Sequence, residues 1–311
     1  MKVAVLKGGK SLERGVSLRS GARVEDALKR LGHEALPVDA GADLVERLLA
    51  EEPEVAFVAL HGRGGEDGTA QELLEILGIS FTGPGVAACS LCMDKALAKH
   101  TLRGAGVPTP DWFAINQVAL RELGAGEALG ELEQRLGFPL VVKPSRGGSA
   151  LGVKFAADPA EVPAALVSAF SYDDRVLLER FVDGRELAVS ILGGEALPIV
   201  EAIPTGGDRY DFEARYEIGR TRFECPANLG AEQDAAVTEA ALGAYEALGC
   251  AGFSRVDLIL GENGPQVLEV NAIPGLTDTS LLPQAAEAAG QSFEDLVERI
   301  LELALEPSAA A

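Results

Sequence analysis

The sequence has no long apolar run. Its longest apolar stretches are about six residues, as at Val55–Leu60, whereas a helix that crosses a bilayer needs ~20. The first stretch, Val3–Leu6, is also too short for the core of a signal peptide and leads directly into a strand–helix pattern. We therefore expect a cytoplasmic protein that does not contact membranes.

Positive charge and cysteine are also scarce. The 311 residues include 27 Lys and Arg against 48 Asp and Glu, a net charge of −21, which would repel nucleic acid. Of the four cysteines, Cys89 and Cys92 have CxxC spacing, but no second pair or His cluster accompanies them. We interpret them as small buried residues rather than a zinc or redox site. An anionic substrate must then be held by local basic groups and a metal ion.

The composition, 47% hydrophobic and 24% charged, is that of a globular protein. The length of 311 residues predicts two or three domains. Alternating strands and helices over residues 1–90 predict a small doubly wound α/β domain. Further helices are predicted at Asp94–Leu102, Gly124–Gly137, Asp158–Ala169, Ala235–Leu248 and Ser292–Leu305. Further strands are predicted at Phe138–Lys143, Leu151–Phe155, Arg175–Val182 and Arg185–Leu192.

The strongest chemical signal lies in residues 253–280. Two apolar runs, Val256–Leu260 and Val267–Val270, flank the turn residues Gly261–Pro265 and predict a β-hairpin. An odd-length loop centred on Asn263 places Asp257 opposite Glu269. A two-residue turn would shift the pairing by one, so we prefer the odd loop, which keeps both faces uniform.

In this register one face of the hairpin is polar, since Arg255 lies opposite Asn271 and on the same face as the two carboxylates. The other face is expected to hold Val256, Leu258, Leu268 and Val270. Opposed carboxylates repel each other, and a divalent cation would offset that repulsion. Hard oxygen ligands without His or Cys favour Mg²⁺, which we expect Asp257, Glu269 and the Asn271 carbonyl to hold. The alternative is a solvated strand face with scattered charge.

Four irregular segments are candidate ligand-binding loops. Glu13 and Ser17 follow the first strand and His61 follows the next strong strand, at the sheet edge where open α/β folds bind ligands. A structural role is the alternative for His61. Gly- and Ser-rich residues 144–150 join two strands, with Lys143 at their base and Arg146 among them, and can close over phosphates. Residues 204–228 lack periodicity, as a functional lid does.

With these motifs in place, the whole chain resembles the D-alanine–D-alanine ligases of the ATP-grasp superfamily. The matching blocks are Gly8-Gly9 with Glu13-Arg14 and Val16-Ser17-Leu18, HGRGGEDGT at 61–69, Met93-Asp94-Lys95, KPSRGGS at 143–149, YDFEARY at 210–216, SRVD at 254–257 and LEVNAIPGLTDTS at 268–280.

The resemblance implies an ATP-grasp fold, with an N-terminal α/β domain over residues 1–95 and two α+β domains, 96–182 and 183–311, that clamp ATP. It implies that ATP phosphorylates the carboxylate of one D-alanine and that the amine of a second attacks the acyl phosphate, for peptidoglycan precursor synthesis. ATP and two Mg²⁺ ions (Mn²⁺ being an alternative) are the implied cofactors, and a homodimer is the implied assembly.

The resemblance also assigns residues. The implied catalytic and substrate-binding residues are Glu13, Ser149, Tyr216, Arg255 and Ser280. The implied nucleotide contacts are Lys95, Lys143, Glu179, Glu186 and Arg215. Asp257, Glu269 and Asn271 match the magnesium ligands. His61, Ser17 and Gly275 are expected to lie behind the residues that contact the ligands and to hold those residues in position.

Two loop positions depart from the usual pattern: Arg215 stands where many relatives have Lys, and Gly147 where many have Glu. These departures bear on loop closure more than on reaction type. Two alternatives stay open at this point. One is a ligase that joins D-alanine to D-lactate or D-serine, and the other is a nucleotide-binding relative without catalysis.

Overall fold

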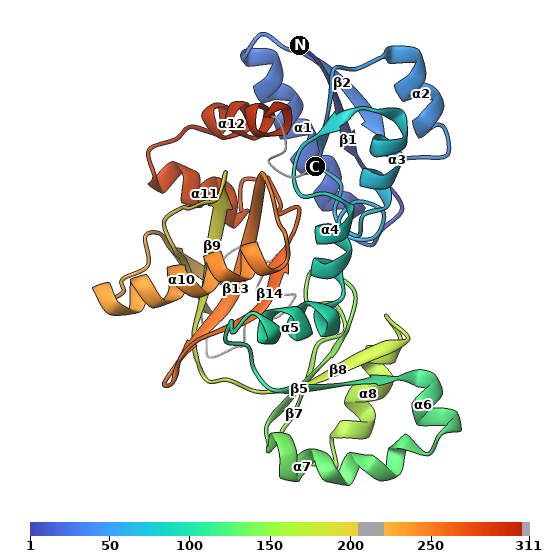
Figure 1. Ribbon diagram of the computed structural model, residues 1–311, viewed down its shortest axis with the longest axis vertical. Helices are drawn as coiled ribbons and strands as arrows, with labels where there is room; N and C mark the ends of the chain where they lie inside the picture. The colour runs from blue at the N-terminus through green and yellow to red at the C-terminus, as the bar shows by residue number, and fades with distance from the viewer. Residues whose placement is uncertain (205–220, 307–311) are drawn as a thin grey trace.

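Three β-sheets organise the part of the chain that the computed structural model describes, residues 1–204 and 221–306 (Figure 1). The first sheet is parallel, in the order β2-β1-β3-β4. Its elements are β1 (Lys2–Lys7), α1 (Arg14–Arg30), β2 (Glu34–Asp39), α2 (Leu44–Glu51), β3 (Val55–Val58), α3 (Thr69–Leu77) and β4 (Ser80–Phe81).

Strand β1 is buried on both faces. Val3 and Val5 pack in one core cluster with α1, while Ala4 and Leu6 pack in another with α2 and α3. Helices on both faces of a parallel sheet define a doubly wound α/β unit, so the prediction for residues 1–90 is confirmed.

The second sheet forms the lower lobe in Figure 1 and is antiparallel, in the order β5-β8-β6-β7. Its elements are β5 (Trp112–Asn116), α6 (Gln117–Glu122), α7 (Glu131–Leu136), β6 (Leu140–Pro144), β7 (Lys154–Ala156), α8 (Val162–Phe170) and β8 (Arg175–Arg180). The single helix predicted over residues 124–137 is wrong in its first half, where a 3₁₀ helix, η1 (Ala125–Gly130), precedes α7. Three glycines in that half lower its α-helix propensity.

The third sheet follows the path β12-β11-β9-β13-β14, with β10 paired to β9. Its elements are β9 (Gly184–Leu192), β10 (Glu195–Ala196), β11 (Val200–Pro204), β12 (Thr221–Glu224), α10 (Ala231–Ala247), β13 (Phe253–Gly261), β14 (Gly264–Asn271), α11 (Leu281–Ala288) and α12 (Phe293–Leu305). Helix α12 returns to the first sheet and packs against α1, so the chain's two ends share one core (Figure 1).

Two helices connect the first sheet to the lower lobe: α4 (Val86–Met93) and α5 (Lys95–Gly104). Asp94 begins α5, because its side chain accepts hydrogen bonds from the backbone N–H groups of Ala96 and Leu97. Cys89 and Cys92 are buried in this region and carry free thiols, as the sequence predicted.

The β13–β14 hairpin has the predicted pairing but not the predicted loop. Asp257 lies opposite Glu269, and Arg255 lies opposite Asn271. The loop is a two-residue turn rather than an odd one, and a β-bulge between Asp257 and Leu258 restores the register by adding Leu268 to β14. Leu268 therefore faces the cavities described below instead of the core, which is a correction to the predicted apolar face.

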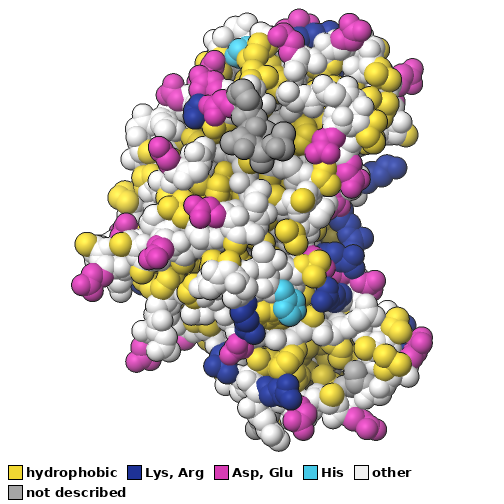
Figure 2. Space-filling view, viewed as in Figure 1, with side chains coloured by type: hydrophobic (Ala, Val, Ile, Leu, Met, Phe, Trp, Pro, Cys, Tyr) yellow, Lys and Arg dark blue, Asp and Glu magenta, His cyan; other side chains and the backbone are white. Residues whose placement is uncertain are grey.

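The surface reflects the unequal charge. On the face shown in Figure 2, many of the Lys and Arg side chains lie along the indentation between the lower lobe and the rest of the molecule, while acidic side chains are scattered over the whole face. Within the described ranges no helix has the length and apolar character needed to cross a bilayer.

Candidate active site

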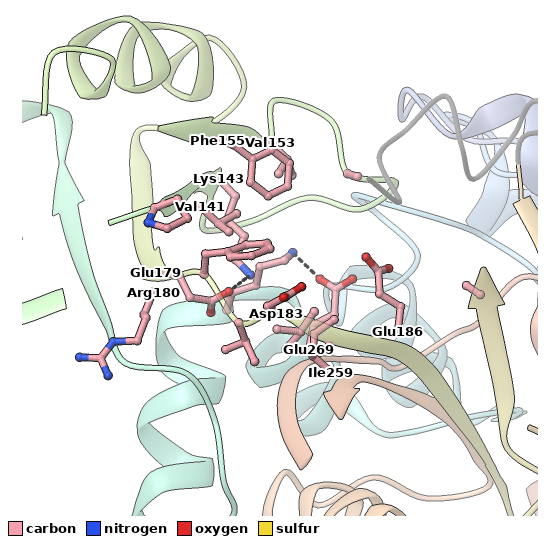
Figure 3. A pocket seen from close by; sticks show the side chains of 18 of the residues that line it. Val141, Lys143, Val153, Phe155, Glu179, Arg180, Asp183, Glu186, Ile259 and Glu269 are labelled. Atoms are coloured by element: carbon pink, nitrogen blue, oxygen red, sulfur yellow. Dashed lines mark hydrogen bonds and ion pairs between the residues drawn. The ribbon is translucent and has the colours of Figure 1, made fainter. Parts of the chain in front are cut away.

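A cavity of about 820 Å³ lies between the sheet of the lower lobe and the third sheet. Its apolar walls come from both sheets and include Val141, Phe155, Phe181, Ile259 and Leu268. Its charged lining includes Lys143, Glu179, Glu186 and Glu269 (Figure 3). Lys95 also lines it. A large, mostly apolar cleft with a few convergent charges is typical of a site for a small molecule.

Glu179 forms the charged floor of this cavity. Its Oε1 accepts from Lys143 Nζ at 2.7 Å, and its Oε2 lies 2.5 Å from Lys99 Nζ. Burial alone would raise the pKa of Glu179, but the two lysines outweigh burial and lower it, so the carboxylate stays ionised. Burial, together with the neighbouring Lys143, lowers the pKa of Lys99 to about 8.

A second cavity, of about 110 Å³, adjoins the first. The two share lining residues Gly148, Glu186, Ala202, Ile259 and Leu268. The second cavity is lined by four expected substrate-binding residues, Glu13, Ser149, Arg255 and Ser280. It is also lined by two expected magnesium ligands, Asp257 and Asn271, and by two residues expected to support the site, His61 and Gly275. The nucleotide and substrate assignments thus fall in two compartments that open into each other.

Glu13 sits in a close-fitting niche of the second cavity. A Cβ on Gly62 would lie 2.5 Å from Glu13 Oε2, and a Cβ on Gly148 would lie 2.9 Å from Glu13 Oε1, so a side chain at either position would displace the carboxylate. The Ser149 hydroxyl donates to the same carboxylate. Burial, reinforced by the nearby Glu66, raises the pKa of Glu13. A carboxylate in such a niche is suited to pairing with a substrate cation.

Ser149 and Ala150, the last two residues of the glycine-rich loop, have an unusual backbone conformation. Their φ angles are +56° and +54°, in the left-handed region that side chains other than glycine rarely adopt. Strain of this kind persists where surrounding contacts hold it, here the bond from Ser149 to Glu13.

The polar face of the hairpin is neutralised by cations of the chain itself. Arg255 donates to Asp257 through Nε at 2.7 Å and through Nη2 at 2.8 Å, and Asn271 Nδ2 donates to Asp257 Oδ2 at 3.1 Å. Lys95 Nζ lies 3.1 Å from Glu269 Oε2. Arg255 and Lys95 therefore offset the repulsion between the carboxylates, which corrects the expectation that a divalent cation is needed for this.

The same residues nevertheless fit Mg²⁺ by donor chemistry. Asp257 and Glu269 are paired across one hairpin, and Asn271 adds an amide oxygen beside them. In the described ranges no three His, Cys, Asp or Glu side chains form a metal-binding cluster by themselves. An ion here would need further oxygens from water or phosphate, which is how Mg²⁺ usually completes its shell.

Ser280 lies at the start of α11, next to Gly275. Its Oγ accepts from the backbone N–H of Thr277 at 3.0 Å, and a Cβ on Gly275 would lie 2.8 Å from the same oxygen. Backbone N–H groups at a helix N-terminus attract carboxylates. Arg23 of α1 supports this loop, since its Nη1 donates to the carbonyls of Leu276 and Thr277 at 3.1 and 3.0 Å.

His61 and Ser17 hold neighbouring elements together. The His61 ring contacts Ser20 Oγ at 3.0 Å through Nε2, and the Ile273 carbonyl and Glu66 at 3.2 Å through Nδ1. Ser17 Oγ accepts from Gly8 N–H and donates to the Ala59 carbonyl, which links the ends of β1 and β3. Ser17 does not line either cavity, whereas His61 lines the second.

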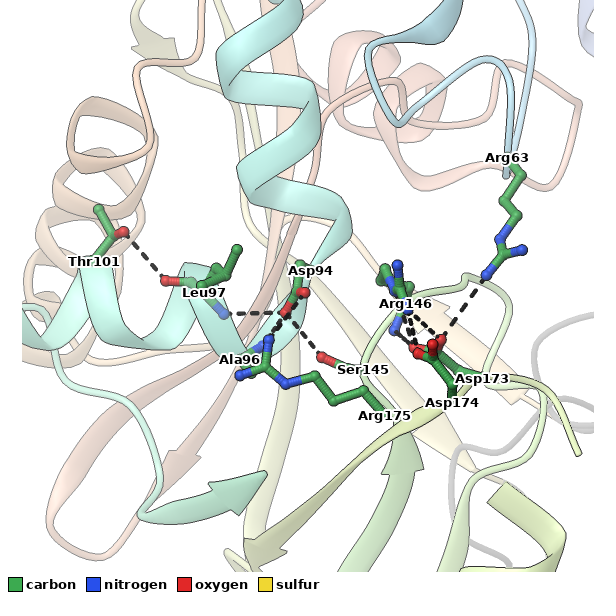
Figure 4. A network of polar contacts seen from close by, with 10 residues as sticks. All are labelled: Arg63, Asp94, Ala96, Leu97, Thr101, Ser145, Arg146, Asp173, Asp174 and Arg175. Atoms are coloured by element: carbon green, nitrogen blue, oxygen red, sulfur yellow. Dashed lines mark hydrogen bonds and ion pairs between the residues drawn. The ribbon is translucent and has the colours of Figure 1, made fainter. Parts of the chain in front are cut away.

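Arg146 points away from the cavity that Lys143 lines. Its Nη2 donates to Asp173 Oδ1 at 2.8 Å and to Asp174 Oδ1 at 2.5 Å, and Arg63 from the first domain lies 3.9 Å from the same Asp173 oxygen (Figure 4). Arg146 therefore anchors the beginning of the glycine-rich loop, and the closure of residues 144–150 over phosphates stays a prediction.

Apart from Ser17, the predicted site residues in the described part of the chain thus line the two cavities. Arg215 and Tyr216, and the whole YDFEARY block, lie outside the described residues. The sequence analysis missed Glu66, Arg23 and Lys99. Lys99 had a usable signal, because it follows Lys95 by four residues on a predicted helix and so shares its face.

Comparison with known proteins gives consistent matches along the chain. A family model described as the D-Ala D-Ala ligase C-terminus matches residues 101–302. A D-alanine–D-alanine ligase of Syntrophotalea carbinolica is 46% identical over 300 residues, covering 96% of this chain and 95% of that protein. The corresponding ligase of Geobacter sulfurreducens is 45% identical over 302 residues, covering 96% and 93%.

Solved structures agree. The crystal structure of a Bacillus anthracis D-alanine–D-alanine ligase complexed with ATP has a TM-score of 0.84 at 35% identity, covering 98% of this chain and 97% of that one. The VanG D-Ala:D-Ser ligase of Enterococcus faecalis has a TM-score of 0.82 at 28% identity, covering 98% and 99%.

Proposed function

The chain belongs to the D-alanine–D-alanine ligase family, and we propose that it joins two D-alanines at the expense of ATP for peptidoglycan precursor synthesis. The observation that carries this proposal is the junction of the two cavities. Lys95, Lys143 and Glu179 line one, Glu13, Arg255 and Ser280 line the other, and Gly148 and Leu268 line both. A phosphoryl donor and its acceptor can therefore meet at one point.

In the proposed reaction, ATP occupies the larger cavity with its phosphates toward Lys95 and Lys143 and its base toward Glu179. Glu186, on β9, contacts the ribose. A carboxylate oxygen of the first D-alanine forms a bond to the γ-phosphorus, and ADP leaves. Positioning and charge neutralisation supply most of the catalysis of such a transfer.

The second half-reaction joins the two amino acids. The amine nitrogen of the second D-alanine attacks the carbonyl carbon of the acyl phosphate, the amine loses a proton, and the C–O bond to phosphate breaks. Arg255, fixed by its pairing with Asp257, faces the cavity where the oxyanion would form and stabilises it. Glu13 pairs with the ammonium group of the first substrate, while Ser280 and the start of α11 bind the carboxylate of the second.

Asp257, Glu269 and Asn271 are the proposed magnesium ligands, with Mn²⁺ as an alternative ion. Bound there, the ions would neutralise the charge of the phosphates. Arg215 and Tyr216 are proposed to complete the nucleotide and second-substrate sites. A cytoplasmic location and a homodimeric assembly are also part of the proposal and follow the family resemblance.

The test is ADP release with ATP, Mg²⁺ and a panel of D- and L-amino acids and D-hydroxy acids, with the products separated by chromatography. D-alanyl-D-alanine is expected as the main product near neutral pH. The structural likeness to a D-Ala:D-Ser ligase makes D-serine the most informative competitor. Predominant D-alanyl-D-serine or an ester with D-lactate would redirect the assignment within the family. ATP binding without ADP release would indicate a protein that has lost catalysis.

A further inference from the structure

Lys99 is a fully buried lysine that no step of the proposed reaction uses. It lies one turn after Lys95 on α5, but it lines neither cavity. Its Nζ is 2.5 Å from Glu179 Oε2 and donates to Thr109 Oγ1 at 2.5 Å. Thr109 Oγ1 donates in turn to the Val267 carbonyl on β14 at 2.8 Å. The ammonium group is thus fixed behind Glu179, between the lower lobe and the hairpin.

Glu179 is shared between two lysines that differ in their freedom to move. Lys143 lines the cavity and can turn toward bound phosphates, whereas the contact with Thr109 holds Lys99 in place. A buried carboxylate that loses its only cation becomes strongly unfavourable and takes up a proton or moves. If Lys99 stays beside Glu179 when Lys143 turns toward the phosphates, Glu179 keeps one cation and stays ionised.

We infer that Lys99 is a positioning residue for the nucleotide, which keeps Glu179 ionised and in place while Lys143 binds phosphate. An ionised carboxylate only accepts hydrogen bonds, so it favours a base that presents a donor. Adenine offers an exocyclic amino group, and hypoxanthine has a carbonyl at the same position. Lys99 thereby sets a preference for ATP over ITP. This inference rests on the proposed function only in placing ATP in the larger cavity.

The first test is calorimetric titration of the full-length protein with ATP and with ITP, with Mg²⁺ and without D-alanine. Lys99→Met is expected to weaken ATP binding at least tenfold and ITP binding less, so the preference for ATP shrinks. Arg103→Met is the matched control, because Arg103 follows on the same helix and pairs with Asp111 at 2.8 Å, away from the cavities. It should leave both affinities unchanged. A lower Tm for Lys99→Met with an unchanged ATP/ITP ratio would overturn the inference, since it would mean a purely structural role.

The second test covers the case in which Lys99→Met does not fold. The double variant Lys99→Met/Glu179→Gln removes both charges, and it is compared with Glu179→Gln alone. If Lys99 acts through Glu179, the two variants have the same ATP/ITP ratio. A further change in the double variant would show that Lys99 acts by another route and would overturn the inference.

The two proposals fail separately. A wild-type protein that prefers ATP to ITP but forms no D-alanyl-D-alanine contradicts the proposed function and leaves the role of Lys99 intact. A wild-type protein that forms D-alanyl-D-alanine but binds ATP and ITP with equal affinity contradicts the role of Lys99 and leaves the proposed function intact.

Discussion

Removing the charge of Asp257 should destabilise the protein even when no metal or nucleotide is bound. Asp257 accepts two hydrogen bonds from Arg255 and one from Asn271, and the side chains of Asp257 and Arg255 are each only 12% exposed. Asp257→Asn keeps one oxygen as an acceptor but leaves the guanidinium without its counter-charge. The repulsion between Asp257 and Glu269, which lie opposite each other on neighbouring strands, predicts the opposite result. If that repulsion dominated, removing one of the two charges would increase stability.

The geometry decides between the two effects. Losing one partner of a buried ion pair costs about 3–5 kcal/mol, and the oxygen that asparagine retains reduces this to about 2–4 kcal/mol. The repulsion from Glu269 is already offset, because Lys95 lies 3.1 Å from Glu269. At roughly 2 °C per kcal/mol for a chain of this size, Tm should fall by about 4–8 °C.

The assay is thermal unfolding in EDTA without nucleotide, with Glu269→Gln as the control. Glu269→Gln should lower Tm less, by an amount that corresponds to about 1 kcal/mol, because Lys95 still donates to the Gly147 carbonyl at 2.6 Å. An apo Tm for Asp257→Asn equal to or above that of the wild-type protein would refute the reasoning, since it would mean that carboxylate repulsion dominates the hairpin.

Three further predictions concern the substrate side. Gly148→Ala should lower kcat/KM for D-alanine at least tenfold with little change in Tm, because its Cβ would lie 2.9 Å from Glu13 Oε1; Gly130→Ala, with open space around it, is the control in the same assay. Because burial and then Glu66 raise the pKa of Glu13, activity should fall on the acid side as Glu13 takes up a proton, and Glu66→Gln should move that limb of the kcat/KM–pH profile to lower pH. Arg23→Met should raise KM for the second D-alanine and leave ATP affinity unchanged in calorimetry, since Arg23 holds the Leu276–Thr277 carbonyls of the loop that ends at Ser280.

The sequence by itself determined the elements whose signals are local. Alternation along a strand puts Arg255, Asp257, Glu269 and Asn271 on one face, and alternating strands and helices predict the α/β unit of residues 1–90. The ordered blocks of residues identified the family before any contact was known. These inferences succeed because each depends on residues close in the chain or on the order of motifs along it.

The tertiary structure decided which charges meet. Only the fold shows that Arg255 and Lys95 neutralise the hairpin carboxylates, that Asp173 holds Arg146 away from the larger cavity, and that Lys99 supports Glu179. It also shows that a bulge, rather than an odd loop, sets the hairpin register. Apart from the bond between Arg255 and Asp257, these contacts join residues far apart in the chain. Their distances depend on how three sheets pack against one another, which neither the spacing nor the composition of the sequence specifies.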